Sequence, residues 1–157
     1  RMLSLLRTGD PTGVEPQPGI ARLEDLVVEA RSTGLPVSLS VTGRATGPLD
    51  PPAGVGLTVY RLVQEALTNA RRHGGTVSRV DVRVHRAQDR LEVEVLDDGD
   101  GPSAPADSSE PSPGSPGHGL VGMRERVASH GGTLETGPRA DGGFRVRAVL
   151  PIRNGEP

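Results

Sequence analysis

Two runs of alternating apolar residues near the middle of the chain constrain its fold most strongly. Every second residue is apolar in VDVRV, residues 80–84, and again in LEVEV, residues 91–95. A short polar segment that includes RAQD, residues 86–89, separates the two runs. This spacing predicts an antiparallel β-hairpin with one apolar face and one wet face. Such a sheet has to bury its apolar face against a second layer.

Three segments have the apolar spacing of helices that could form this second layer. Residues 21–34, 51–73 and 120–130 carry apolar residues at intervals of three and four, and each pattern stops at glycine. Glycine is common after a helix because it adopts the left-handed backbone of a C-terminal cap. We therefore expect three helices, of which the middle one is the longest.

Three further segments alternate as strands, at residues 36–43, 133–137 and 144–152. With the hairpin, the predicted order is helix, strand, helix, two strands, loop, helix, two strands. This order predicts a two-layer α/β sandwich, in which a mixed, mostly antiparallel sheet carries helices on one face.

Composition limits the possible chemistry. The length of 157 residues fits one domain. All 18 basic residues are arginine and cysteine is absent, which excludes a P-loop lysine, a Schiff-base lysine and a thiolate nucleophile. The net charge of -2, without a basic run, gives no indication of a nucleic-acid partner. No segment has the roughly 18 apolar residues of a membrane span, so we expect no direct membrane contact.

Both ends and one internal segment differ in composition from the rest. Residues 1–15 join a short apolar patch to a Pro/Gly-rich linker, which predicts the end of a preceding helix. Residues 102–117 are rich in Pro, Ser and Gly, as lids, binding loops and disordered segments are. The domain itself is expected to span residues 16–152, followed by a tail at residues 153–157.

Three glycines lie around the start of the last predicted helix, in GHGLVG, residues 117–122. A Rossmann fingerprint needs a strand before its first glycine, whereas a Pro/Ser-rich segment stands here. Gly117, Gly119 and Gly122 would instead leave backbone amides exposed at a helix start, where a phosphate can approach. Glycines that only connect a loop to a helix are an equally supported alternative.

An acidic cluster, DDGDG at residues 97–101, directly follows the second strand of the hairpin. It is either a tight acidic turn, which is the commoner case, or a strand-end carboxylate that accepts a hydrogen bond from a ligand amino group.

A polar stripe lies on the long predicted helix, in QEALTNARRH at residues 64–73. Glu65, Asn69 and either Arg72 or His73 fall at helical spacing beside the apolar face. A solvated helix face is the common explanation of such a row. However, Asn is unfavourable inside a helix, and the row offers a base, a metal ligand and a phosphate contact.

In this order, the three segments resemble the N, G1 and G2 boxes of the ATP-binding domain shared by gyrase-, Hsp90-, histidine-kinase- and MutL-type proteins. YRLVQEALTNARRH, DDGDG and GHGLVGMRERV further resemble the nitrate-sensor-like family of bacterial two-component sensor histidine kinases. The resemblance extends from about residue 16 to residue 152. It implies the Bergerat-type ATP-binding fold, with ATP and Mg²⁺ as ligands.

The resemblance also implies roles for individual residues. Asn69 would ligate the Mg²⁺ that bridges the ATP phosphates, and Glu65 would lie near the γ-phosphate as a catalytic base or water-positioning residue. Arg72 and His73 would face the phosphates, and Asp97 would accept from the adenine amino group. The other implied ATP-binding residues belong to the last two boxes: Gly99, Gly101, Gly117, His118, Gly119, Leu120 and Gly122. Residues 102–117 would form the ATP lid.

The chain departs from the family pattern in one turn, where Phe144 follows Gly142-Gly143 instead of the threonine of many relatives. This departure leaves open whether that turn makes the contact implied by the family pattern. The family's phosphoacceptor histidine lies on an upstream dimerisation domain, of which residues 1–7 would be the final turn. We therefore expect a monomeric, cytoplasmic fragment that binds ATP without phosphorylating itself. Its partners would be that dimerisation domain and, through the full-length protein, a response regulator; the parent could be membrane-anchored.

Two other functions remain open on the same fold. One is a non-catalytic nucleotide-binding or protein-interaction module, such as an anti-sigma-like protein. The other is the ATPase subunit of a molecular machine, which would need additional domains.

Overall fold

The computed structural model describes residues 18–43, 51–100 and 118–152. Its helical elements are η1 (Ile20–Arg22), α2 (Leu23–Ser32), α3 (Ala53–His73) and α4 (His118–Ser129). Its strands are β1 (Val37–Gly43), β2 (Val80–Arg86), β3 (Arg90–Asp97), β4 (Thr133–Pro138) and β5 (Phe144–Pro151). The three helices and five strands predicted within residues 21–152 are confirmed, with ends that differ by at most two residues.

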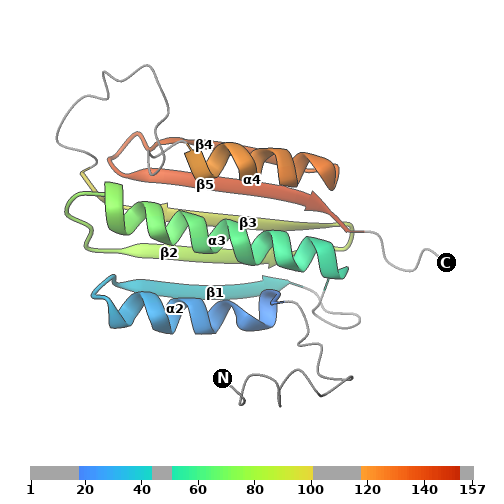
Figure 1. The fold of residues 1–157 in the computed structure, drawn as a ribbon, viewed down its shortest axis with the longest axis horizontal. Coiled ribbons are helices and arrows are strands. Elements are labelled where there is room, and N and C mark those ends of the chain that lie inside the picture. The colour runs from blue at the N-terminus through green and yellow to red at the C-terminus, as the bar shows by residue number, and fades with distance from the viewer. Residues whose placement is uncertain (1–17, 44–50, 101–117, 153–157) are drawn as a thin grey trace, which may run out of the picture.

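The five strands form one sheet in the order β1-β2-β3-β5-β4. β1 pairs with β2 in parallel, while the β2–β3, β3–β5 and β4–β5 pairs are antiparallel. Figure 1 shows α2, α3 and α4 on the same side of this sheet. The two-layer α/β sandwich with a mixed, mostly antiparallel sheet is therefore confirmed.

The core lies between the sheet and the helices. The hairpin contributes its alternating residues, since Val82 pairs with Val95 and Val84 with Val93 in the β2–β3 register, and all four are buried. The helix α3 contributes the apolar stripe that the sequence predicts, which is Val55, Val59, Leu62, Val63, Ala66, Leu67 and Ala70. Figure 1 shows α3 across the middle of the sheet, with its C-terminal end beside the end of β3.

The opposite face of the hairpin is polar, as its alternation predicts. Glu94 accepts a hydrogen bond of 2.7 Å from Arg145 Nε of β5 and lies 3.5 Å from Arg83 Nη1 of β2. All three residues are on neighbouring strands, so charges of opposite sign alternate across this face.

The predicted domain boundaries at residues 1–15 and 153–157 lie outside the described residues, as does the predicted lid at residues 102–117. These three assignments remain predictions.

Candidate functional site

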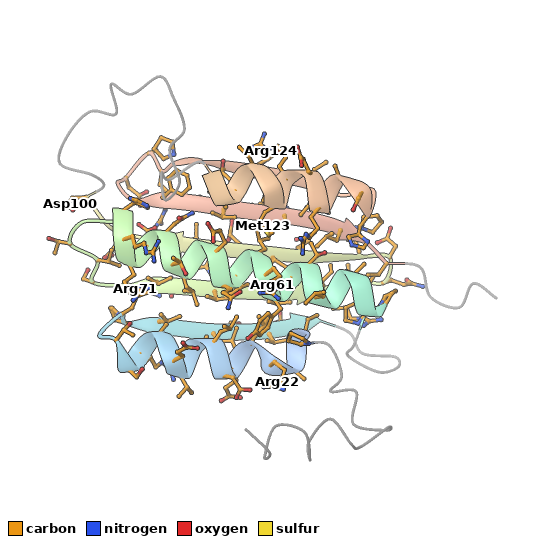
Figure 2. All side chains as sticks on the ribbon, viewed as in Figure 1. Arg22, Arg61, Arg71, Asp100, Met123 and Arg124 are labelled. Carbon is orange, nitrogen blue, oxygen red and sulfur yellow. The ribbon has the colours of Figure 1, made fainter. Side chains whose placement is uncertain are left out.

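A cavity of about 400 Å³ lies between the C-terminal half of α3, the end of β3 and the β4–β5 turn. Its lining is Ala66, Asn69, Ala70, His73, Gly74, Val95, Asp97, Gly99, Asp100, Pro138, Arg139, Gly142, Gly143, Phe144 and Val146. Most of these residues are small or apolar, and a few polar groups stand among them. A cavity of this size and lining suits a small organic ligand. Figure 2 shows Asp100 just beyond β3, at the end of the sheet where α3 also ends.

Asp97 is the buried carboxylate of this cavity. Its side chain is at the last position of β3, and the residue is 8% exposed. The Gly99 amide donates a hydrogen bond of 2.9 Å to Asp97 Oδ1, and the Phe144 amide also donates to this carboxylate. Burial raises the pKa of Asp97, although both amides and the Arg139 guanidinium act to lower it. The carboxylate therefore has fixed partners and faces an apolar space.

The residues after Asp97 are hydrogen-bonded to the loop between α3 and β2. Asp98 accepts hydrogen bonds of 2.9 Å from the amides of Ser78 and Arg79, and a further one from the Ser78 hydroxyl. Asp100 Oδ1 accepts a hydrogen bond of 2.7 Å from the Thr76 amide. Asp98 and Asp100 thus accept hydrogen bonds within the protein, while Asp97 and Asp100 line the cavity. That Asp97 accepts a hydrogen bond from a ligand amino group stays a prediction.

The α3 stripe reaches the cavity through Asn69 and His73. Asn69 Nδ2 is buried and has no hydrogen-bond partner among the described residues. A buried amide without a partner costs free energy, and a bound ligand would remove this cost. Arg72 is exposed and is not part of the lining.

Glu65 lies one helical turn before Asn69, outside the cavity lining. It is placed against the first turn of α4, because a Cβ atom added to Gly119 would overlap the Glu65 carboxyl group. A carboxylate is favourable at a helix N-terminus, where the backbone amides are unpaired. The polar stripe therefore continues from the cavity to the start of α4.

The other predicted residues of α4 differ in position. Leu120 is buried in the core, whereas Gly122 is exposed and has open space where a Cβ atom would stand. Met123 packs towards α3, and Arg124 points away from it (Figure 2). The backbone of His118 begins α4, while the His118 side chain, Gly101 and Gly117 lie outside what the structure describes.

The β4–β5 turn contributes residues that the sequence analysis did not assign to the site. Pro138, Arg139, Gly142, Gly143 and Phe144 line the cavity. In the β3–β5 register, Phe144 stands directly opposite Asp97, which brings this turn to the end of β3. Gly143 has φ +98°, and a Cβ atom there would collide with the Asp97 carbonyl oxygen. The glycine pair at 142–143 was the available signal, because it marks a turn in close approach to other backbone.

The polar groups of the cavity can be compared with the ligands that a nucleotide-bound Mg²⁺ requires. No cluster of three His, Asp or Glu side chains suited to a metal occurs in residues 18–43, 51–100 and 118–152. Mg²⁺ commonly binds through one or two protein oxygens together with substrate phosphates. The Asn69 side chain carries such an oxygen, Oδ1, beside the Nδ2 that is unpaired within the part of the chain that the structure describes. The residues therefore fit Mg²⁺ that arrives with a nucleotide.

Among the described residues, none of the helices combines the length and the apolar character that a membrane crossing requires.

Comparison with known proteins connects this site to a family. Residues 54–154 match the family described as histidine kinase-, DNA gyrase B-, and HSP90-like ATPase. The chain is 33% identical over 125 residues to the sensor histidine kinase LnrJ of Bacillus subtilis, covering 79% of this chain and 28% of that protein. It is 35% identical over 105 residues to the histidine-protein kinase/phosphatase DegS of Brevibacillus brevis, covering 67% and 25%. The chain thus spans about a quarter of each relative's length.

Solved structures agree with the fold. The blue-light activated histidine kinase of Erythrobacter litoralis EL346 superposes with a TM-score of 0.62 at 25% identity, covering 88% of this chain and 47% of that one. A nucleotide-free catalytic domain of the histidine kinase ThkA superposes with a TM-score of 0.54 at 15% identity, covering 83% and 92%.

Proposed function

This chain belongs to the histidine kinase-, DNA gyrase B- and HSP90-like ATPase family, and from this premise we propose that it is the ATP-binding catalytic domain of a sensor histidine kinase. The parent protein would transfer the γ-phosphoryl group of ATP to a histidine on its dimerisation domain, for onward transfer to a response regulator. The similarity of the chain to LnrJ and DegS, which are named histidine kinases, supports this proposal. Membership of the nitrate-sensor-like subgroup stays a prediction.

One observation carries the proposal, which is the position of Asp97 in the cavity. A buried carboxylate with an apolar space in front of it is an acceptor for a ligand amino group. Adenine presents an amino group at the position where guanine presents a carbonyl. Guanine would leave the buried acceptor without a donor, and that cost would select ATP over GTP.

The site then has two ends. We call Asp97, Gly99, Arg139 and Gly143 the base end, because they surround the proposed position of adenine. We call Glu65, Asn69 and the first turn of α4 the phosphate end. The two ends are joined by the cavity, which Asn69 and Asp97 both line.

The phosphate end would position the reacting groups. The Asn69 oxygen would hold Mg²⁺, which supplies charge neutralisation for the phosphates when it is bound. The α4 backbone amides would receive a phosphate oxygen, and Glu65 would lie near the γ-phosphate as the base or water-positioning residue. His73 lines the cavity and could contact a phosphate, whereas the exposed Arg72 would have to turn inward. This positioning is the main requirement of phosphoryl transfer.

The acceptor would come from outside this chain. In the transfer step, a nitrogen of the acceptor imidazole attacks the γ-phosphorus while the bond to the β–γ bridging oxygen breaks, and ADP leaves. The ATP lid at residues 102–117 and, at residues 1–15, the end of a preceding dimerisation helix with its linker belong to the proposal as parts predicted from the sequence. Accordingly, we expect the isolated chain to bind ATP and to remain unphosphorylated.

Isothermal titration with a non-hydrolysable ATP analogue tests the proposal. The titration is run with and without Mg²⁺, and beside it with the matching GTP analogue. We expect binding that depends on Mg²⁺ and strongly favours the adenine nucleotide. Absence of binding would support the alternative, a protein-interaction module that keeps the fold but no longer binds a nucleotide.

A further inference from the structure

The β4–β5 turn contributes a charged residue to the base end for which neither the sequence motifs nor the proposed function provides a role. We propose that Arg139 is a positioning residue, which holds the end of β3 so that Asp97 meets the adenine amino group. This inference rests on the proposed function and extends it to a residue that selects the base indirectly.

The contacts of Arg139 place it between the turn and Asp97. Arg139 Nη1 donates a hydrogen bond of 3.0 Å to the Asp97 carbonyl oxygen. Its own amide donates to the Gly143 carbonyl at 2.9 Å, and the Gly142 amide donates back to the Arg139 carbonyl at 3.2 Å. The turn is therefore closed on itself and attached to the last residue of β3.

The attachment is partly buried and carries a full charge. The Arg139 side chain is 27% exposed, lines the cavity and lies 3.8 Å from the exposed Asp141 carboxylate. A hydrogen bond from a guanidinium to a carbonyl is stronger than one between neutral groups. It acts on the main chain of Asp97, so movement of Arg139 would move the acceptor with it.

The same side chain affects the charge of the acceptor. Burial raises the pKa of Asp97 and the neighbouring Asp98 adds to this effect, whereas the Gly99 and Phe144 amides and Arg139 oppose it. The other ionisable groups that line the cavity are His73 of α3 and Asp100, which follows β3. Asp141 faces Arg139 from the turn. Among these groups, Arg139 is the positive one whose attraction lowers the pKa of Asp97.

The chain offers a matched control in Arg145. This arginine is on β5, one residue after Phe144, is part exposed, and pairs with Glu94 on the polar face of the sheet. Replacing Arg145 with Gln removes the same charge from a nearby position on the other side of the sheet. Any effect of net charge alone would appear equally in both variants.

The experiment compares Arg139→Gln, Arg139→Lys and Arg145→Gln with the wild type. Affinity for the ATP and GTP analogues is measured by titration calorimetry between pH 5 and 8, and the Asp97 carboxyl ¹³C signal is followed by NMR without nucleotide. We expect Arg139→Gln to weaken ATP binding about tenfold, by loss of a charged hydrogen bond, and to reduce the ATP:GTP ratio. The Asp97 midpoint should move to higher pH, and so should the acid limit of ATP binding. Arg139→Lys should restore the midpoint, because it restores the charge.

Two results would overturn the inference. Equal losses of ATP and GTP affinity with an unchanged Asp97 midpoint would mean that Arg139 contacts a part shared by both nucleotides. Wild-type behaviour of Arg139→Gln in both measurements would mean that the residue only closes the turn. In either case wild-type ATP binding would leave the proposed function intact, whereas failure of the wild type to bind ATP would refute the proposed function and the selection role together.

Discussion

The two ends of the cavity are built in opposite ways. At the base end, the Asp97 carboxylate and carbonyl groups already have hydrogen-bond partners within the protein. At the phosphate end, the Asn69 amide nitrogen is buried without a partner in the described part of the chain. Under the proposed function, the base end would be ready for the nucleotide before it binds, and the phosphate end would be completed by the nucleotide.

This difference suggests a division of labour. A preorganised acceptor discriminates between bases without having to reorganise. An unsatisfied amide makes the empty protein less stable, and the ligand recovers that free energy on binding. Selectivity would thus depend on strands and a tight turn, while the strength of Mg²⁺-dependent binding would depend on α3.

Removing the unsatisfied group should have the largest effect on binding. In Asn69→Ala we expect affinity for the Mg²⁺-ATP analogue to fall on the order of a hundredfold, as when a metal site loses a needed group. The empty protein should keep or gain stability, because Ala is favourable in a helix and the unpaired amide is gone. Calorimetric titration and thermal melting measure the two effects.

Thr68→Ala is the matched control for this experiment. Thr68 is the preceding residue of α3, but its hydroxyl donates to the Gln64 carbonyl at 2.9 Å and it lines a groove on the α2 side of the helix. It should bind ATP as the wild type does. Equal affinities of Asn69→Ala and the wild type would remove Asn69 from the site and end the contrast between the two ends.

A pair of adjacent carboxylates tests the base end. Burial raises the pKa of Asp97. The pKa of Asp98 is lowered, mainly by the hydrogen bond from the Ser78 side chain. Burial opposes this shift, and the Ser78 and Arg79 amides add to it. At pH values between the unfolded and the folded pKa of Asp97, the folded protein holds a proton that the unfolded chain has released. The contribution of Asp97 to stability therefore falls as the pH rises through this range. Asp98 contributes stability at neutral pH that is lost as pH falls through its folded pKa, below 3.8.

Opposite results are therefore expected from the same substitution at neighbouring positions. Asp97→Asn should reduce the ATP:GTP affinity ratio by about tenfold to a hundredfold, and its melting temperature at pH 7 should match or exceed that of the wild type. Asp98→Asn should keep the ratio and melt lower by about 2 °C. Unchanged base selection in Asp97→Asn, or the reverse order of melting temperatures, would contradict the assignment.

Much of the base end could be predicted from the sequence because its elements are local. Alternation in residues 80–84 and 91–95 determines which way β3 faces, and Asp97 follows directly. Arg139 and Gly143 could not be placed in this way, since they reach Asp97 through the β3–β5 pairing, which joins residues more than 40 positions apart. The periodicity of one segment does not indicate how that strand is aligned with a strand distant in the sequence.

The phosphate end shows a different limit. Helical spacing allowed either Arg72 or His73 to continue the stripe of Glu65 and Asn69, because positions three and four residues apart are both neighbours on a helix. The cavity lies on the side of His73, and Arg72 is exposed. The choice depends on how α3 is rotated over the sheet, which is a property of packing. The contact between Glu65 and Gly119 likewise depends on where α4 begins.

Two glycines of α4 give the smallest and most local test of that contact. A Cβ atom at Gly122 would meet open space, so Gly122→Ala should stabilise the protein by about 0.5–1 kcal/mol through helix propensity. A Cβ atom at Gly119 would overlap the Glu65 carboxyl group, so Gly119→Ala should displace the end of that flexible side chain and gain less stability than Gly122→Ala. Urea unfolding of the two variants measures the difference.

The double variant Gly119→Ala/Glu65→Ala decides whether Glu65 is the cause. Removing the Glu65 carboxyl group should leave room for the methyl group that the Gly119→Ala substitution adds. Adding Gly119→Ala to Glu65→Ala should therefore be more favourable than adding it to the wild type. Additive effects of the two substitutions would mean that the start of α4 does not rest on Glu65. In that case the phosphate end would be formed by Asn69 and His73 alone, and the polar stripe of α3 would stop at the cavity.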